Sequence, residues 1–256
     1  MFLISALKDG NWLNLRRVRA YPRIFITLFV ILGIAWASGL HEKFKPGEGP
    51  LVTDFVNVYA SGLAVREGTP AQAYDWNIQK IREDGIKVAL NKGNAITSDA
   101  GFLPWLYPPM FFAVATLAAF LPYWIALIVY SLLGLAAYMA SLSKLIPKYK
   151  ESYLVLAAFP GVFVNLFSGQ NGFITTSLFA AGLFLLESWP VAAGLAFGAL
   201  SYKPHFFVLV PIVLLAGRYW KALAATLLSA CAYAALSYEI FGADAWIAFF
   251  QSFAKT

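Results

Sequence analysis

The sequence predicts an all-α protein, a polytopic transmembrane helical bundle, and three observations favour this class. Hydrophobic residues make up 60% of the 256 residues, and charged residues only 12%. The mean hydropathy of +0.68 is far above the value expected of a soluble domain. The apolar runs suit about seven spans of roughly 20 residues each.

The charge pattern does not indicate a nucleic-acid-binding protein, although the net charge is +6. Five basic residues crowd the N-terminal tail before the first apolar run, in the positive-inside pattern of a membrane protein. They are Lys8, Arg16, Arg17, Arg19 and Arg23. We therefore expect a multi-pass protein of the plasma membrane (the bacterial inner membrane), surrounded by membrane lipids and without a nucleic-acid partner.

The first span is predicted close to the N-terminus. Residues 1–23 are expected to be a cytoplasmic tail, and residues 24–40, which carry no charge, the first span. Ala35-Trp36-Ala37 has the form of a signal-peptidase site, but the apolar run is longer than a usual signal core, which favours an uncleaved anchor. Residues 41–122 are then expected to be an external loop with amphipathic and re-entrant helices.

Three helices are predicted within this external loop. Residues 54–66 carry apolar side chains at i, i+4 and i+8, and residues 71–90 a weaker stripe, so both are expected to lie on the membrane surface. Thr53 suits the N-cap of the first helix. Only the residues from 110 to 121 are uninterrupted before Pro122, about 18 Å of helix, which is too short to cross a bilayer. We expect this third helix to be re-entrant or interfacial.

Residues 123–241 are predicted to form the transmembrane bundle, and residues 242–256 an external C-terminal segment. The predicted spans of the bundle are 123–142, 153–167, 172–188, 190–201, 205–217 and 220–241. This topology places ten basic and three acidic residues inside, against nine and ten outside, which obeys the positive-inside rule. The short spans at 190–201 and 205–217 could instead be one helix kinked at Pro204, which would reverse the topology of the residues after it.

Asp54 is the candidate catalytic base. The sequence contains no phosphate-binding Gly-rich loop, no HExxH and no G-x-S-x-G motif, and its two histidines are far apart, so no metal site is predicted. An acid at the membrane edge can face both water and the bilayer and can accept a proton from a hydroxyl group. The alternative is an acid placed at a helix start by the macrodipole.

The other candidate residues are expected at the same membrane face as Asp54. Lys203 suits an anionic partner such as a phosphodiester, or is a lysine that snorkels at the end of a span. Gln170 and Asn171 can hydrogen-bond sugar hydroxyls, or simply form a turn between two glycines. The predicted substrate-binding set is completed by Tyr107, Asp75 and His205. Aromatic residues such as Tyr107 also occur in the interfacial belt of membrane proteins.

A series of short motifs follows in a distinctive order along residues 50–250. They are Asp54-Phe55, Arg66-Glu67-Gly68, Tyr74-Asp75, Tyr107-Pro108-Pro109, Ser168-Gly169-Gln170-Asn171, Lys203-Pro204, and Phe241-Gly242 before Trp246. In this order the chain resembles glycosyltransferase family 87, which includes the bacterial mannosyltransferases that use polyprenyl-phosphate-mannose. The resemblance implies an integral membrane enzyme of the GT-C fold with a seven-span module. Such enzymes pass a sugar from a lipid phosphate to a lipid or glycan acceptor at the outer face of the membrane.

The resemblance also implies a site and a mechanism. Asp54 matches the first-loop aspartate taken as the catalytic base of the family, and the transfer is expected to be inverting. The expected donor is polyprenyl-phosphate-mannose or a similar lipid-linked sugar, with no other cofactor, and its chain is expected in a groove near residues 107–120. The loop 168–171 carries no carboxylate, unlike the metal-binding acids in oligosaccharyltransferases of the same fold, so we expect no metal requirement.

One departure from the family pattern leaves alternatives open. The chain stops at Thr256, soon after the last predicted span, whereas members of the family usually continue with further spans. The alternative is a non-catalytic membrane subunit, or one half of a split pair with a second membrane subunit. A small transporter or flippase is disfavoured, because no predicted span has a charge deep in its middle.

Overall fold

A computed structural model describes residues 13–38, 54–90 and 102–255, and the regular structure in these residues is entirely helical. The predicted all-α class is therefore confirmed. The expected N-cap Thr53 and the histidine His41 lie outside the described residues, as does the beginning of the expected cytoplasmic tail.

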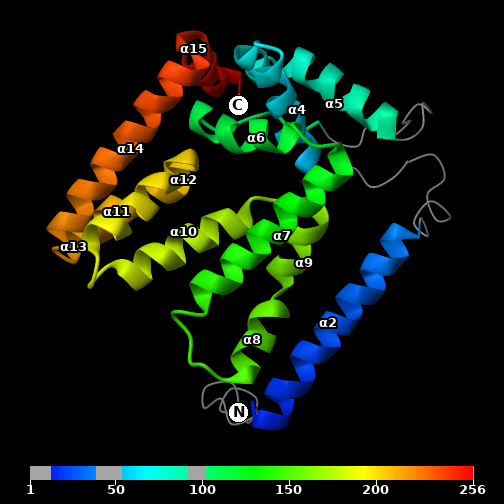
Figure 1. Cartoon of the computed structure of the whole chain (residues 1–256), viewed down its shortest axis with the longest axis vertical. Helices are drawn as coiled ribbons and strands as arrows, with labels where there is room; N and C mark the ends of the chain where they lie inside the picture. The colour runs from blue at the N-terminus through cyan, green and yellow to red at the C-terminus, as the bar shows by residue number, and fades with distance from the viewer. Residues whose placement is uncertain (1–12, 39–53, 91–101, 256) are drawn as a thin grey trace, which may run out of the picture.

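Among the described residues, the first two α-helices after the N-terminal one lie at one end of the molecule, close to the C-terminus. In Figure 1, α4 (Phe55–Arg66) and α5 (Trp76–Leu90) lie at the same end as the C-terminus, and α2 (Leu15–Ala37) and α8 (Lys150–Ala157) reach the opposite end. The last helix, α15 (Ala243–Ser252), packs against the 3-10 helix η1 (Pro70–Tyr74), and the rings of Tyr74 and Phe249 lie 5.8 Å apart. The C-terminal helix thus helps to hold the segment that follows α4.

Three described helices are long and apolar enough to cross a membrane: α2, α7 (Tyr123–Leu142) and α14 (Trp220–Phe241). The bounds of α7 and α14 are those that the sequence predicted. Helices α8 and α9 (Pro160–Ser168) meet the same criterion only as a pair, and they are bent by 48° at the break between them. The described residues thus contain three candidate spans, or four with the bent pair, as expected of a multi-pass membrane protein.

The seven predicted spans are not present at full length in the described residues. The span expected at 153–167 is broken before Pro160, because a proline inside a helix removes a hydrogen bond and clashes with the preceding turn. The span expected at 172–188 is α10 (Gly172–Leu185), whose 14 residues give about 21 Å of helix against a bilayer core of about 30 Å.

The spans expected at 190–201 and 205–217 are also short. They correspond to α11 (Pro190–Ala199) and to the consecutive helices α12 (Pro204–Phe207) and α13 (Leu209–Ala216). The apolar residues Leu200 and Val208 lie outside these three helices, so the apolar runs of the sequence do not mark the exact helix ends.

The chain reverses its direction at Lys203 and does not continue as one kinked helix. Val210 and Leu214 of α13 belong to the same buried cluster as Ala193 of α11. Figure 1 shows that α12 and α13 run back toward the end of the molecule where α11 begins. The alternative of a single helix kinked at Pro204 is therefore wrong. Pro204 begins α12 at position N1, where its missing N–H leaves no bond unmade.

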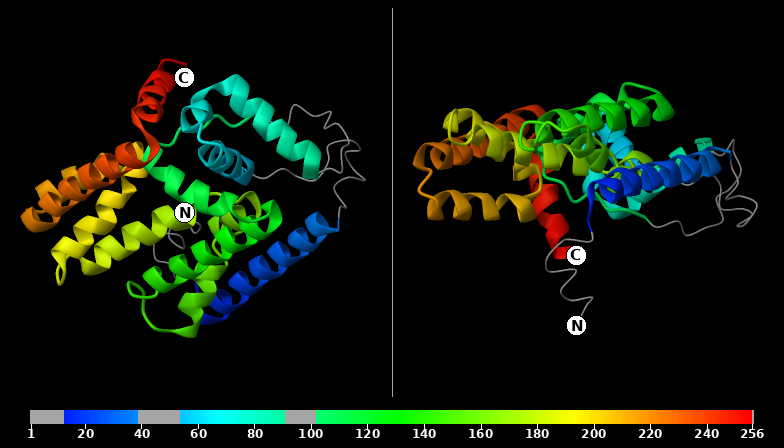
Figure 2. Two further views of the ribbon diagram at one scale, coloured as in Figure 1. Left: turned by 45° about the horizontal axis from the view of Figure 1, so that its top comes forward. Right: turned by 90° about the horizontal axis from the view of Figure 1, so that it is seen from below.

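Helix α2 begins earlier than predicted, because the basic residues of the expected tail continue the helix from Leu15. Arg19 forms an ion pair with Glu151 of α8, with 2.7 Å between Nε and Oε1. The rings of Phe29 and Phe163 stack with their centroids 4.7 Å apart. Helix α2 therefore lies along α8 and α9, as Figure 1 and both views of Figure 2 show.

Helix α4 is buried inside the molecule, and its expected position at the membrane surface stays a prediction. Residues on all sides of the helix are buried, among them Phe55, Val56, Asn57 and Val58. The amphipathic stripe of the sequence therefore marks only part of its packing surface.

Helix α6 (Phe112–Ala119) packs closely against α4. Gly62 of α4 allows this approach, because a Cβ atom there would overlap the carbonyl oxygen of Ala115. Arg66 donates a hydrogen bond to the carbonyl of Ala119, and the Tyr59 hydroxyl donates one to Leu121 O (2.9 Å). The eight residues of α6 are too few to cross a bilayer, as expected for this segment.

Helix α5 turns a polar face inward and leaves two residues of the apolar stripe predicted for residues 71–90 exposed. Ile78 and Ile81 are exposed, whereas Gln79 and Glu83 are fully buried against α4. Asn57 of α4 donates a hydrogen bond to Glu83 Oε1 (3.1 Å). Burial raises the pKa of Glu83 to about 7, although Asn57 and the nearby Lys87 oppose this increase.

Replacement of Glu83 by Gln is expected to change the pH dependence of stability. The raised pKa means that the folded state retains a proton that the unfolded state has already lost between pH 4.5 and about 7. Wild-type stability should therefore fall as the pH rises through this window, by on the order of 2 kcal/mol between pH 5.5 and 8. Thermal unfolding in detergent should show this loss in the wild type and in Glu67→Gln, but not in Glu83→Gln. An equal loss in all three proteins would contradict the assignment.

Candidate functional site

The candidate site begins at Asp54, which directly precedes α4. Its side chain is half-buried and makes no capping hydrogen bond to the first turn of α4. Its Oδ2 atom instead accepts a hydrogen bond from Nε2 of Gln170. The carboxylate is therefore directed to a partner far away in the sequence, which a simple helix-start acid would not need.

The turn between α9 and α10 carries Gln170 and lies tightly against α4. Gly169 ends α9 in the left-handed conformation, with φ of 65°. A Cβ atom at this position would lie 2.5 Å from Cβ of Phe55 and 2.8 Å from Cδ1 of Leu127. Only glycine combines this backbone conformation with so close an approach. Asn171 follows and is buried, with 2% of its surface exposed.

Tyr107 reaches the same region from the segment before η2 (Pro109–Phe111). Its carbonyl accepts a hydrogen bond from the buried hydroxyl of Tyr74 (2.8 Å), which fixes the backbone. Burial raises the pKa of the Tyr107 hydroxyl, Asn171 opposes the increase, and the negative charge of Asp54 adds to it. Tyr107 is therefore near both Asn171 and Asp54.

Two residues that sequence reasoning missed complete this polar cluster. The hydroxyls of Thr175 and Tyr202 lie 2.7 Å apart, and the Tyr202 hydroxyl also donates to the carbonyl of Asn171 (3.3 Å). Thr175 lies in α10, and Tyr202 ends the 3-10 helix η3 (Leu200–Tyr202). The only signal in the sequence was the position of Tyr202, directly before Lys203.

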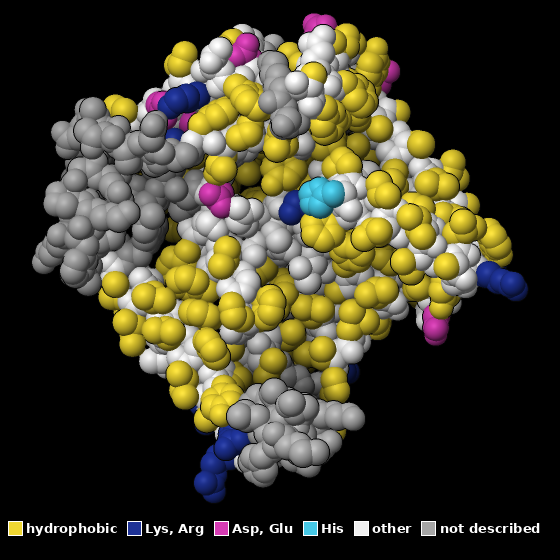
Figure 3. Space-filling model, turned by 180° about the vertical axis from the view of Figure 1, so that it is seen from behind, with side chains coloured by type: hydrophobic (Ala, Val, Ile, Leu, Met, Phe, Trp, Pro, Cys, Tyr) yellow, Lys and Arg dark blue, Asp and Glu magenta, His cyan; other side chains and the backbone are white. Residues whose placement is uncertain are grey.

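Lys203 adjoins the cluster through Tyr202. Its Nζ atom lies 6.0 Å from the ring centroid of Tyr202 and 5.6 Å from that of Phe206, within the range of cation–π contacts. Burial lowers the pKa of Lys203. Among the residues that the structure describes, Lys203 makes no ion pair. Figure 3 shows a hollow in the rear face of the molecule, with an acidic side chain at one margin and a basic and a histidine side chain at the other.

The described contacts do not bring Asp75 and His205 into this cluster. Asp75 Oδ1 accepts hydrogen bonds from the backbone N–H groups of Asn77 (3.0 Å) and Ile78 (3.2 Å), so it caps the start of α5. His205 is exposed in α12, and its ring lies 4.7 Å from that of Phe206. Their expected part in substrate binding stays a prediction.

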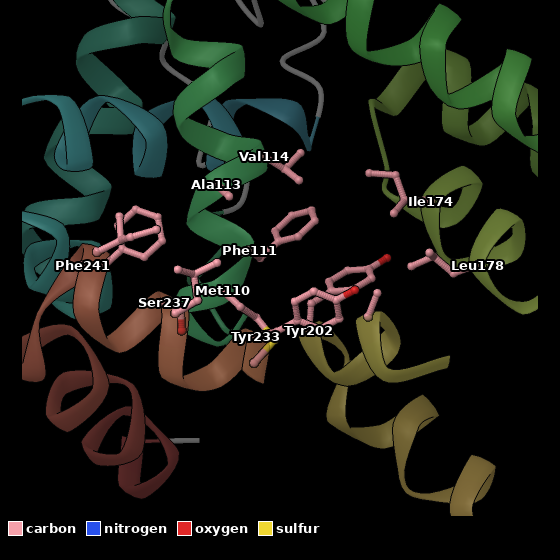
Figure 4. Close-up of a pocket in the computed structure, with 13 residues that line it drawn as sticks. Met110, Phe111, Ala113, Val114, Ile174, Leu178, Tyr202, Tyr233, Ser237 and Phe241 are labelled. Atoms are coloured by element: carbon pink, nitrogen blue, oxygen red, sulfur yellow. The ribbon is translucent and has the colours of Figure 1, made fainter. Parts of the chain in front are cut away.

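An apolar pocket of about 270 Å³ lies beside Tyr202 (Figure 4). Its walls come from η2, α6, α10, the end of α11, η3 and α14. Met110, Val114, Leu178 and Phe241 are among the lining residues, so the pocket borders the segment near residues 107–120 where a lipid chain was expected. Tyr202 thus separates an apolar space from the polar cluster at Asp54.

Within the described parts of the chain, no group of three or more His, Cys, Asp and Glu residues could hold a metal ion. The expectation that the reaction needs no metal remains a prediction.

These features define a class: a multi-pass helical membrane protein with a polar cluster around a carboxylate next to an apolar pocket. The model for glycosyltransferase family 87 matches residues 105–256, and the chain belongs to that family. Family membership makes it a membrane glycosyltransferase. The matched segment includes Tyr107, Gln170, Asn171 and Lys203, and Asp54 lies before it. Neither the curated proteins nor the solved structures contained a match to this chain.

Proposed function

We propose that the protein transfers a sugar from a polyprenyl-phosphate donor to a lipid or glycan acceptor at the outer face of the membrane, and that this sugar is mannose. Asp54 is the general base. The observation that supports this most is the hydrogen bond from Gln170 to Asp54, because it joins the matched family segment to the carboxylate. In this proposal, residues 41–122 and 242–256 face the outside.

The proposed reaction is a single displacement. The acceptor hydroxyl gives its proton to Asp54, and its oxygen forms a bond to the anomeric carbon of the donor sugar. The bond between that carbon and the phosphate oxygen breaks, and its electron pair stays on the phosphate. Gln170 orients the carboxylate through Oδ2, which leaves Oδ1 as the oxygen that we assign to the proton.

The cluster and the pocket provide separate places for the two parts of the donor. The apolar pocket beside Tyr202 would hold isoprene units of the lipid chain near the phosphate. Lys203, next to Tyr202, would lie near the departing phosphate and offset its negative charge. Asn171 and Tyr107 would contact the sugar between the phosphate and Asp54.

Replacement of Lys203 by Met should lower kcat/KM by about 10- to 100-fold, because a hydrogen bond to a charged group is worth roughly 1.5–3 kcal/mol. Arginine keeps the charge and should retain part of the activity. Burial lowers the pKa of Lys203, so wild-type transfer should decline as the pH rises and this proton is lost. The decline should move to higher pH in Lys203→Arg. Equal pH profiles for wild type and Lys203→Arg would contradict the role.

The class of donor can be tested in membranes that contain the overexpressed chain. The membranes receive either polyprenyl-phosphate-[14C]mannose or GDP-[14C]mannose, with a donor-synthesis inhibitor present to prevent conversion between them. We expect label in a new lipid or glycan product only from the lipid donor. Transfer from the nucleotide alone would contradict the proposal. No transfer from either, with retained binding of the lipid, would favour the alternative of a non-catalytic or split-partner subunit.

A further inference from the structure

Two buried polar groups in the region of Phe55 and Tyr202 lack a hydrogen-bond partner among the described residues. They are the hydroxyl of Tyr130 and the amide oxygen of Asn171. Buried polar atoms are nearly always hydrogen-bonded, and leaving them unpaired is unfavourable. A group that binds here therefore finds unsatisfied donors and acceptors already in place.

Tyr130 lies against the first residue of α4. It comes from α7, and its ring centroid is 5.2 Å from that of Phe55, the residue after Asp54. Tyr130 and Tyr107 both pack against the buried cluster that contains Phe55 and Tyr202. The phenol therefore belongs to the polar cluster and not to the lipid-facing side of α7.

Asn171 adjoins the same two tyrosines. Its carbonyl accepts a hydrogen bond from Tyr202, and its side chain is near enough to affect the ionisation of Tyr107. Tyr130 of α7 and the turn that carries Asn171 both lie against Phe55, because the Tyr130 ring is 5.2 Å from the Phe55 ring and Gly169 of the turn packs on the same residue. Between them they offer hydrogen-bond donors and acceptors but no charge, which suits a neutral hydroxyl group better than a phosphate.

We propose that Tyr130 is a specificity-determining residue that, together with Asn171, hydrogen-bonds a hydroxyl group of the donor sugar. This inference rests on the proposed function and names a contact that it did not include. A site whose buried polar groups are paired by a substrate hydroxyl discriminates strongly against an analogue without it, because those groups are then left unpaired.

The test uses Tyr130→Phe with a panel of monodeoxy analogues of polyprenyl-phosphate-mannose. For the intact donor we expect kcat/KM to fall about 10- to 100-fold. In wild type, kcat/KM for one deoxy analogue should be lower than for the intact donor by a similar factor. In Tyr130→Phe that difference should disappear, whereas the differences for the other analogues should remain. The matched control is Tyr138→Phe, eight residues further along α7, whose hydroxyl instead donates a hydrogen bond to Leu156 O (3.2 Å).

Thermal unfolding of the free protein separates this role from a structural one. Removing an unpaired hydroxyl should leave the unfolding midpoint of Tyr130→Phe unchanged or higher, whereas Tyr138→Phe should lower it. A lower midpoint for Tyr130→Phe with unchanged discrimination among donors would overturn the inference, as would wild-type kinetics with every donor. If wild type itself transfers no sugar from the intact donor, the proposed function fails first. If wild type is active and Tyr130→Phe discriminates as wild type does, only the inference about Tyr130 fails.

Discussion

Asp54→Asn is expected to lower the transfer rate by about 10²- to 10⁴-fold, the usual contribution of a general base. Asparagine has nearly the same size and offers Gln170 a carbonyl oxygen in place of Oδ2, so the turn should keep its position. The amide cannot accept the proton of the acceptor hydroxyl. Initial rates with a labelled lipid donor, at matched protein amounts in the membrane, measure the effect.

The control for this variant is Asp84→Asn, the same chemical change at a half-exposed acid of α5 that pairs with Lys80 (3.0 Å) and Lys87 (3.4 Å) outside the candidate site. It should transfer sugar at the wild-type rate. Donor binding should persist in Asp54→Asn, because the proposed base acts on the acceptor. Wild-type turnover in Asp54→Asn would refute the assignment of the base.

Gly169→Ala is expected to lower activity by about 10²-fold, because displacing reacting groups by about 1 Å costs that much. The new Cβ would lie 2.5 Å from Cβ of Phe55, so the turn must move away from α4. That movement separates Gln170 from Asp54. The measurement is kcat with the lipid donor, together with the unfolding midpoint in detergent.

Gly68→Ala is the matched control for this change. Gly68 also has a positive φ, of 74°, but a Cβ there would meet nothing within 4 Å. Both variants strain a left-handed residue by about 1 kcal/mol, and only Gly169→Ala adds a collision beside the carboxylate. Equal activities in the two variants would contradict the proposal that close packing of the turn against α4 holds Gln170 next to Asp54.

Strong apolar periodicity and helix-ending signals predicted much of the fold. Helices α7 and α14 have the predicted bounds, and the short segment before Pro122 does not span, because an uninterrupted apolar run and a proline fix these features locally. The number of spans and the burial of α4 and α5 depend on tertiary packing. The inward polar face of α5, with Gln79 and Glu83, cannot be recognised without knowing that α4 supplies partners.

The candidate site was predictable in part. Charge counting placed Asp54, Gln170 and Lys203 at one face, and the structure joins Asp54 directly to Gln170 across a separation of 116 residues. Their roles remain proposals. Tyr130 and Tyr202 could not be singled out, because a tyrosine in an apolar run looks the same in sequence whether it faces lipid or a polar cluster. Asp75 was predicted to bind substrate, but its position before a helix suits an N-cap equally well, and in the structure it caps α5.

The stereochemistry of transfer tests the central claim most directly. The purified chain in lipid vesicles receives a synthetic polyprenyl-phosphate-mannose of known anomeric configuration and an acceptor, and the configuration of the new glycosidic bond is determined by NMR. A single displacement assisted by Asp54 predicts that the product has the opposite configuration to the donor. A product with retained configuration would require a covalent intermediate or another mechanism, and would contradict the role of Asp54 as a general base.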